Sequence, residues 1–121
     1  MNYKELAVWQ KSMDLAEEIY KLTSKLPSNE TFRLISQLRR ACVSIPSNIA
    51  EGQMRNTTKE YINFLCMARG SNAEIETQLL LCHRIKYLST EQTKSALSLT
   101  SEIGRMLNGL INKLNCNESK S

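Results

Sequence analysis

A proline lies inside a segment whose apolar residues keep helical spacing, and this combination limits the folds open to the chain. A proline in a helix interior removes one backbone hydrogen bond and costs roughly 3 kcal/mol. The apolar stripe nevertheless continues on both sides of Pro46. It consists of Leu38, Cys42, Ile45 and Ile49. A helix that keeps its stripe across a proline is expected to be kinked there, not broken.

Helical periodicity continues along the rest of the chain and predicts an all-α protein. Only two of the 121 residues are proline and four are glycine, so the chain offers few breaks within each periodic segment. We expect four helices, at approximately 6–25, 30–52, 57–86 and 89–114, and a polar tail at 115–121. This length suits one domain. The prediction is therefore a single all-α domain of four helices over residues 1–121, with its second helix kinked at Pro46.

Capping motifs mark several of the expected helix ends. Thr57 with Glu60, and Ser89 with Gln92, have the spacing of capping boxes, in which side chains satisfy free backbone N–H groups of the first turn. Gly52 is expected to close the second helix, because glycine readily adopts the left-handed conformation that follows many helix C-termini.

The first expected helix carries apolar residues on two nearly opposite sides. One stripe consists of Leu6, Trp9, Met13, Ala16 and Tyr20, and the other of Val8, Leu15, Ile19 and Leu22. A helix of a monomeric bundle needs only one apolar face. Either stripe suits the core, and the other must be covered by another helix of the same chain or by another chain.

The residues that commonly carry catalysis or bind metals are sparse. The chain has one histidine, His83, and its four cysteines match no zinc or redox spacing. Cys42 and Cys82 fall on apolar stripes, where cysteine behaves as a small buried hydrophobe. We therefore expect no catalytic residue, no metal and no cofactor, and a hydrolase or nuclease would need an active site that the sequence does not show.

Polar residues along the second and third helices admit three interpretations. They could form a solvated helix face, a partly buried network that fixes how the two helices meet, or a direct site for a ligand or nucleic acid. Serines beside the proline could also bond the carbonyl groups that it leaves free. The residues are Arg40, Ser44, Ser47, Asn48, Glu51, Glu74 and Glu76.

Three segments of the chain carry a resemblance to a known family. They are LRRACVSIPSNIAEG at 38–52, LAVWQKSMDLAEEIYKLT at 6–23 and KEYINFLCMARGSNAEIETQLLL at 59–81. The sequence resembles the four-helix-bundle proteins encoded in intervening sequences of bacterial large-subunit ribosomal RNA genes. The accessory variability determinant proteins of diversity-generating retroelements are related and share the fold. The resemblance implies an up-down antiparallel four-helix bundle that assembles into a homopentamer, and nucleic-acid association for some members. It also favours the polar-network interpretation, because those positions recur in the motif.

A modest positive charge permits a polyanionic partner without requiring one. The net charge is +4 and the isoelectric point about 9.0. In a pentamer, five copies of a weak basic patch could engage several phosphates together. The candidate residues for binding nucleic acid are Arg33, Arg39, Arg40, Arg55, Lys59 and Arg69. The chain shows no basic recognition helix and no stacking platform, so we do not expect sequence-specific base reading.

These observations favour a non-enzymatic, self-associating bundle that serves as an oligomeric scaffold. Its expected partners are further copies of itself and structured RNA or an RNA-handling protein. The alternative is a protein–protein adaptor without nucleic-acid binding. The longest apolar run, 64–68, is too short for a membrane span, and the first five residues form no apolar signal segment. A cytoplasmic location without a membrane partner is expected.

Overall fold

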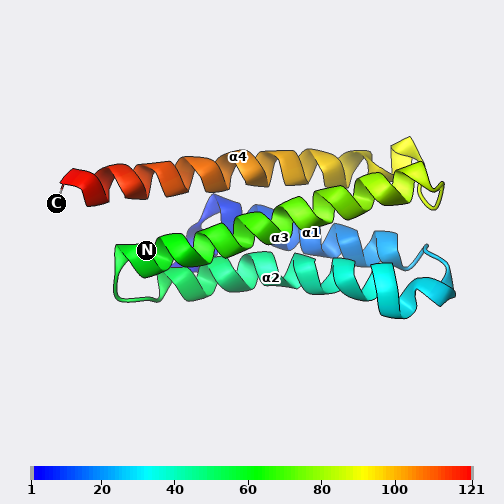
Figure 1. Cartoon of the computed structure of the whole chain (residues 1–121), viewed down its shortest axis with the longest axis horizontal. Helices are drawn as coiled ribbons and strands as arrows, with labels where there is room; N and C mark the ends of the chain where they lie inside the picture. Colours follow the sequence, from blue (N-terminus) through cyan, green and yellow to red (C-terminus); the bar gives the residue numbers. More distant parts are fainter. Residues whose placement is uncertain (1, 121) are drawn as a thin grey trace.

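Four long α-helices run side by side along the length of the molecule (Figure 1). The computed structural model describes residues 2–120, with side chains described through Asn117. The helices are α1 (Ala7–Thr23), α2 (Ser36–Gln53), α3 (Thr58–Arg84) and α4 (Thr90–Lys120). No strand occurs within the described range. The prediction of an all-α four-helix bundle is confirmed.

The helices follow one another around the bundle in chain order. α1 packs against α2 and α4, and α3 packs against the same two helices, so α3 lies diagonally across from α1. The α1–α2 and α3–α4 connections lie at one end of the bundle, and the α2–α3 loop lies at the other (Figure 1). This is the expected up-down arrangement, in which short connections place successive helices antiparallel.

Irregular helical turns lead into two of the α-helices. A 3₁₀ turn, η1 (Tyr3–Glu5), precedes α1. A second 3₁₀ turn, η2 (Ser28–Glu30), and a π-helical turn, η3 (Thr31–Ile35), precede α2. The chain therefore becomes helical near residue 30 as expected, but α2 itself begins only at Ser36.

Pro46 lies buried inside α2, which continues without interruption from Ser36 to Gln53. Asn48 adds hydrogen bonds beside the proline, since its side-chain amide donates to the carbonyl oxygen and the Oγ of Ser44, at 2.9 and 2.8 Å. The predicted continuity of this helix is confirmed, while the kink stays a prediction.

The described residues of the expected polar tail, 115–120, belong to α4, whereas Ser121 lies outside the described residues. The prediction of an end near residue 114 was wrong. Ile111 is buried and Leu114 packs against the core, so the last turns extend a helix that is already anchored. Adding residues to an existing helix is far easier than starting a new one.

One side of α1 supplies the core and the other does not. Val8, Leu15, Ile19 and Leu22 are at most 4% exposed. They pack with apolar side chains of the other three helices. The large, fully buried members from those helices are Leu38, Ile45, Ile49, Leu65, Ile75, Leu79, Ile103 and Leu107. The structure thus decides between the two stripes of α1, and the second stripe stays partly in solvent.

Gly52 permits a close approach of α2 and α3. A Cβ atom at this position would lie 2.7 Å from Cβ of Phe64 and 3.0 Å from Cδ1 of Tyr61. None of the described glycines has a positive φ, and Gly52 lies within α2, so the prediction that it forms a left-handed helix cap was wrong. Of the two predicted capping boxes, Ser89 and Gln92 form both reciprocal bonds, at 2.8 and 3.1 Å.

Alanine substitutions at two glycines should change stability in opposite directions. Gly52→Ala should lower the free energy of unfolding by about 1–3 kcal/mol, because the new methyl group overlaps α3. Gly70→Ala should raise it by about 0.5–1 kcal/mol, since no atom lies within 4 Å of its Cβ position in the interior of α3. Urea denaturation at one protein concentration measures both, and equal effects would contradict the close approach.

Candidate interaction surfaces

The stripe of α1 that does not reach the core forms one side of an apolar groove, and α2 forms the other side. Met13 and Tyr20 of α1 are 42% and 46% exposed, and Val43 of α2 is 47% exposed. The groove has a volume of ≈ 360 Å³. Its lining residues are Tyr3, Trp9, Met13, Ala16, Val43, Pro46, Ser47 and Ala50. We call this surface, together with Tyr20 and Arg39, the α1–α2 face.

Aromatic rings and one arginine give the α1–α2 face a defined shape. The rings of Tyr3 and Trp9 meet edge to face, with centroids 5.5 Å apart. The guanidinium of Arg39 lies 4.6 Å from the ring centroid of Tyr20, and its Nε donates to Oγ1 of Thr23 at 2.8 Å. Tryptophan, tyrosine, methionine and arginine are enriched in protein interfaces. Because the only tryptophan of the chain lies here, the composition suits a contact with another protein surface.

The six basic residues predicted to bind nucleic acid do not form one patch. Arg39 is engaged on the α1–α2 face, whereas Arg69 lies between α3 and α4 and donates to Oδ1 of Asn108 at 3.0 Å. At the α2–α3 loop, Arg55 pairs with Glu51 at 2.8 Å.

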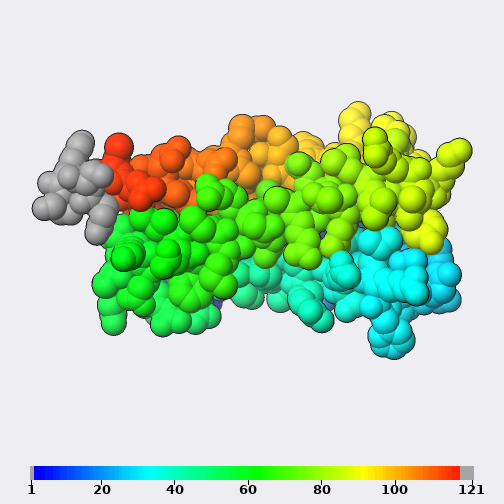
Figure 2. Space-filling view, viewed as in Figure 1, coloured from blue at the N-terminus to red at the C-terminus, as the bar shows by residue number. Residues whose placement is uncertain are grey.

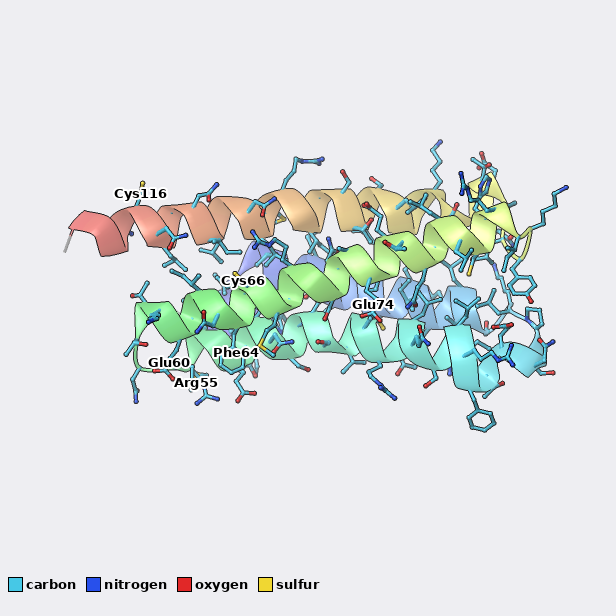
Figure 3. The ribbon with its side chains drawn as sticks, viewed as in Figure 1. Arg55, Glu60, Phe64, Cys66, Glu74 and Cys116 are labelled. Carbon is cyan, nitrogen blue, oxygen red and sulfur yellow. The ribbon has the colours of Figure 1, made fainter. Side chains whose placement is uncertain are left out.

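The remaining basic candidates are all exposed. Arg55 also lies over the ring of Phe64, 4.8 Å from its centroid (Figure 3). Arg33, Arg40 and Lys59 are exposed. The two ion pairs in the described part of the chain, Lys11–Glu102 and Arg55–Glu51, do not involve them.

The residues predicted to form a polar network occupy separate places. Ser44 and Asn48 join α2 to α3, because Oγ of Ser71 donates to Oγ of Ser44 at 2.9 Å. Arg40 and Ser47 are exposed on α2. The network interpretation therefore fits the side of α2 that meets α3, and the solvated-face interpretation fits its outer side.

The two predicted glutamates of α3 have different neighbours. Glu74, labelled in Figure 3, accepts a long hydrogen bond from Nε2 of Gln78, at 3.4 Å. Glu76 accepts from Oγ1 of Thr100 on α4, at 3.3 Å. Both glutamates are exposed to solvent. Neither carboxylate therefore needs an arginine partner, as a buried carboxylate would.

Several polar contacts between helices were missed by the sequence analysis. Nε2 of Gln78 donates to Oε1 of Gln37 at 2.9 Å, which joins α3 to α2. Nδ2 of Asn72 donates to the carbonyl oxygen of Thr100 at 2.9 Å, which joins α3 to α4. The signal was the interruption of the apolar stripe of α3 by two amides, because a buried amide needs a partner on the facing helix.

A second hollow lies between α1 and α4, and most of the residues that line it are polar. Its volume is ≈ 670 Å³. Its lining combines four carboxylates with two lysines, two serines and a leucine: Asp14, Glu17, Glu18, Glu91, Lys21, Lys94, Ser95, Ser98 and Leu99. Mixed charge of this kind is typical of a solvated surface. Among the described residues, no three histidine, cysteine, aspartate or glutamate side chains are placed so that they could hold a metal ion.

The two buried thiols are poor nucleophiles. Burial raises the pKa of Cys42 to about 11, against the smaller opposing effect of Arg39. Burial and the nearby charge of Glu30 also raise the pKa of Cys82. Since the thiolate is the reactive form, both side chains serve packing. His83 is exposed, and its Nε2 lies 2.9 Å from Oγ1 of Thr90.

Thiol reactivity should follow burial. In the folded protein, a disulfide reagent should label exposed Cys116 rapidly and Cys42 and Cys82 only after unfolding. Equal labelling of all four thiols would contradict the burial.

The pKa of Cys42 rises from 9.0 to about 11 on folding, so the unfolded chain loses this proton first as the pH increases. The stability that Cys42 contributes should be present below pH 9 and lost as the pH rises towards 11. Cys42→Ala should remove that part of the pH dependence of the free energy of unfolding.

No helix within the described residues combines the length and apolarity that a membrane crossing requires.

Comparisons with known proteins agree with the fold and the motifs. The family model of the 23S rRNA-intervening sequence protein matches residues 4–109. The structure is also similar, with a TM-score of 0.81, to the crystal structure of a protein of unknown function from the S23 ribosomal protein family of Bacteroides thetaiotaomicron. The two sequences are 30% identical, and the match covers 87% of this chain and 98% of that chain. No curated protein is significantly similar to this chain.

Proposed function

Because the chain belongs to the 23S rRNA-intervening sequence protein family, we propose that it is a non-enzymatic bundle that self-associates and serves as a cytoplasmic scaffold for structured RNA. The observation that carries the proposal is the α1–α2 face. It gathers the only tryptophan, two tyrosines and a stacked arginine around an apolar groove. Apolar surfaces of this composition are typical of protein contacts.

A second apolar surface supports assembly into a ring. Leu80 and Leu81 of α3 are 48% and 44% exposed, and Met67 is 55% exposed. α3 lies diagonally across the bundle from α1, so each protomer offers apolar residues on two different sides. Contacts between unlike surfaces produce rings when the rotation closes, whereas a two-fold dimer uses one surface twice. A ring of five agrees with the homopentamer that the family resemblance implies.

The repetition of one positively charged protomer in an oligomer supports RNA as the partner. One protomer carries a net charge of +4, which is too little to indicate strong phosphate binding. Five copies would carry about +20 and could contact one RNA at several points. A protein adaptor without nucleic acid is the alternative, because the α1–α2 face suits another protein as well as a second copy.

Light scattering on a size-exclusion column, with absorbance recorded at the wavelengths of nucleic acid and protein, tests the proposal. We expect a mass near five times 13.8 kDa and excess nucleic-acid absorbance in the purified protein. The same mass without that excess would favour the adaptor. A monomer would contradict the scaffold.

Two substitutions on α1 separate the core from the proposed contact surface. Met13→Glu should leave the helical content unchanged and reduce the mass to that of one protomer, because the side chain lies on the exposed stripe. Ile19→Glu should unfold the protein, with a loss of more than about 4 kcal/mol, since it places an unpaired charge in the core. Circular dichroism and light scattering measure both. An unchanged mass for Met13→Glu would contradict the assigned contact surface.

A further inference from the structure

One end of the bundle brings together residues that are distant in the sequence. The α1–α2 connection and the α3–α4 turn both lie there (Figure 1). They are tied together by the hydroxyl of Tyr87, which donates to Oε1 of Glu30 at 3.4 Å.

Four exposed cations lie on the segments that meet at this end. Lys25 and Arg33 come from the α1–α2 connection, Arg84 is the last residue of α3, and Lys86 lies in the α3–α4 turn. The ion pairs found in the described part of the chain lie elsewhere, at Lys11–Glu102 and Arg55–Glu51.

The carboxylates of the two turns are fewer than the cations. They are Glu30, which accepts the bond from Tyr87, and Glu91 at the start of α4. The end therefore keeps an excess of positive charge that faces solvent, and phosphate groups are suitable counterions for it.

Lys86 occupies a position where glycine would be more stable. Its φ angle is 66°, and it is the only non-glycine residue with a positive φ in the described range. The turn around it is a Schellman motif, in which Tyr87 N–H donates to the carbonyl of Cys82 at 2.9 Å and Lys86 N–H donates to that of His83 at 3.1 Å. Glycine is the usual residue at this place. A strained lysine there suggests that its side chain has a use.

Phe32 adds an aromatic ring to the same end. It lies on the π turn η3 beside Arg33 and is 93% exposed. In Figure 2 part of this cyan segment projects from the surface of the molecule. A phenylalanine ring in water contributes nothing to the core, but it offers a flat surface on which an unpaired base can stack. From the sequence we expected no stacking platform, and that expectation did not include the exposed ring of Phe32.

We propose that these five residues, the turn-end surface, bind single-stranded segments of the structured RNA. Lys25, Arg33, Arg84 and Lys86 would contact phosphates, and the ring of Phe32 would stack on a base. The inference rests on the proposed function, because it identifies where the scaffold holds its RNA. It also predicts a preference for single strands over duplex, since paired bases are not free to stack on a side chain.

Fluorescence anisotropy with two labelled RNA probes tests this site on the full chain. The probes are a short oligouridylate and a duplex RNA of equal length, each titrated at several salt concentrations. We expect tighter binding of the oligouridylate. Phe32→Ala should weaken it about tenfold. Phe32→Ala and Lys86→Gly should keep the mass of the wild-type assembly. A loss of affinity then reports a lost RNA contact and not dissociation of the protomers.

Lys86→Gly gives the sharper result because binding and stability should change in opposite directions. It should reduce the slope of log affinity against log salt by about 0.7 in magnitude, as expected for one lost phosphate contact on a single strand. It should also raise the melting temperature, since glycine relieves the left-handed strain. Lys113→Ala is the matched control, because it removes an exposed lysine from α4 outside the turn-end surface. It should leave both affinity and salt slope unchanged.

The outcomes separate the site from the function. If the wild type binds neither probe, the RNA part of the proposed function fails and this site fails with it. If the wild type binds oligouridylate but Phe32→Ala and Lys86→Gly bind it equally well, only the turn-end surface is wrong. A loss confined to Arg40→Ala or Lys59→Ala would likewise overturn the turn-end surface while the proposed function stands. Equal binding of duplex and single strand would contradict stacking on Phe32.

Discussion

The two-sided apolar character of α1 determines both the core of the protomer and the apolar surface that is left outside it. Four helices enclose one core, and a helix in such a bundle can turn only one side towards it. Ile19 and its neighbours take that side and are fully or almost fully buried. Met13 and Tyr20 are consequently left exposed and Trp9 half-buried, and Val43 of α2 lines the same groove as Trp9 and Met13. The same packing that stabilises the protomer therefore creates the surface proposed to join protomers.

The contact between α2 and α3 holds the two halves of the bundle in register. Gly52 lets the helices approach closely at one end, where any larger residue would overlap Phe64. Farther along, Ser44 and Ser71 bond across the contact, and Gln37 and Gln78 do so beyond them. Apolar packing has little directionality, whereas each hydrogen bond requires one alignment of donor and acceptor. These polar pairs thus help to select one alignment among several that the apolar stripes permit.

Periodicity and capping residues were sufficient to predict four helices and most of their ends. The role of Gly52 could not be predicted, because a cap and a close contact both favour glycine and only the positions of Tyr61 and Phe64 distinguish them. Periodicity revealed both faces of α1 but not which one is buried, since that depends on the other helices. The turn-end surface was also out of reach, because Phe32 and Lys86 are 54 positions apart and only the bundle topology places them at one end.

Quenching of tryptophan fluorescence reports whether the α1–α2 face lies between protomers, because Trp9 is the only tryptophan and lies in the α1–α2 groove. In an isolated protomer its ring is partly accessible to a small quencher such as acrylamide. We predict that Trp9 is protected from the quencher in the assembled protein and becomes accessible when dilution dissociates the assembly. Easy quenching of Trp9 in a particle larger than one protomer would contradict it, because the assembly would then use another face.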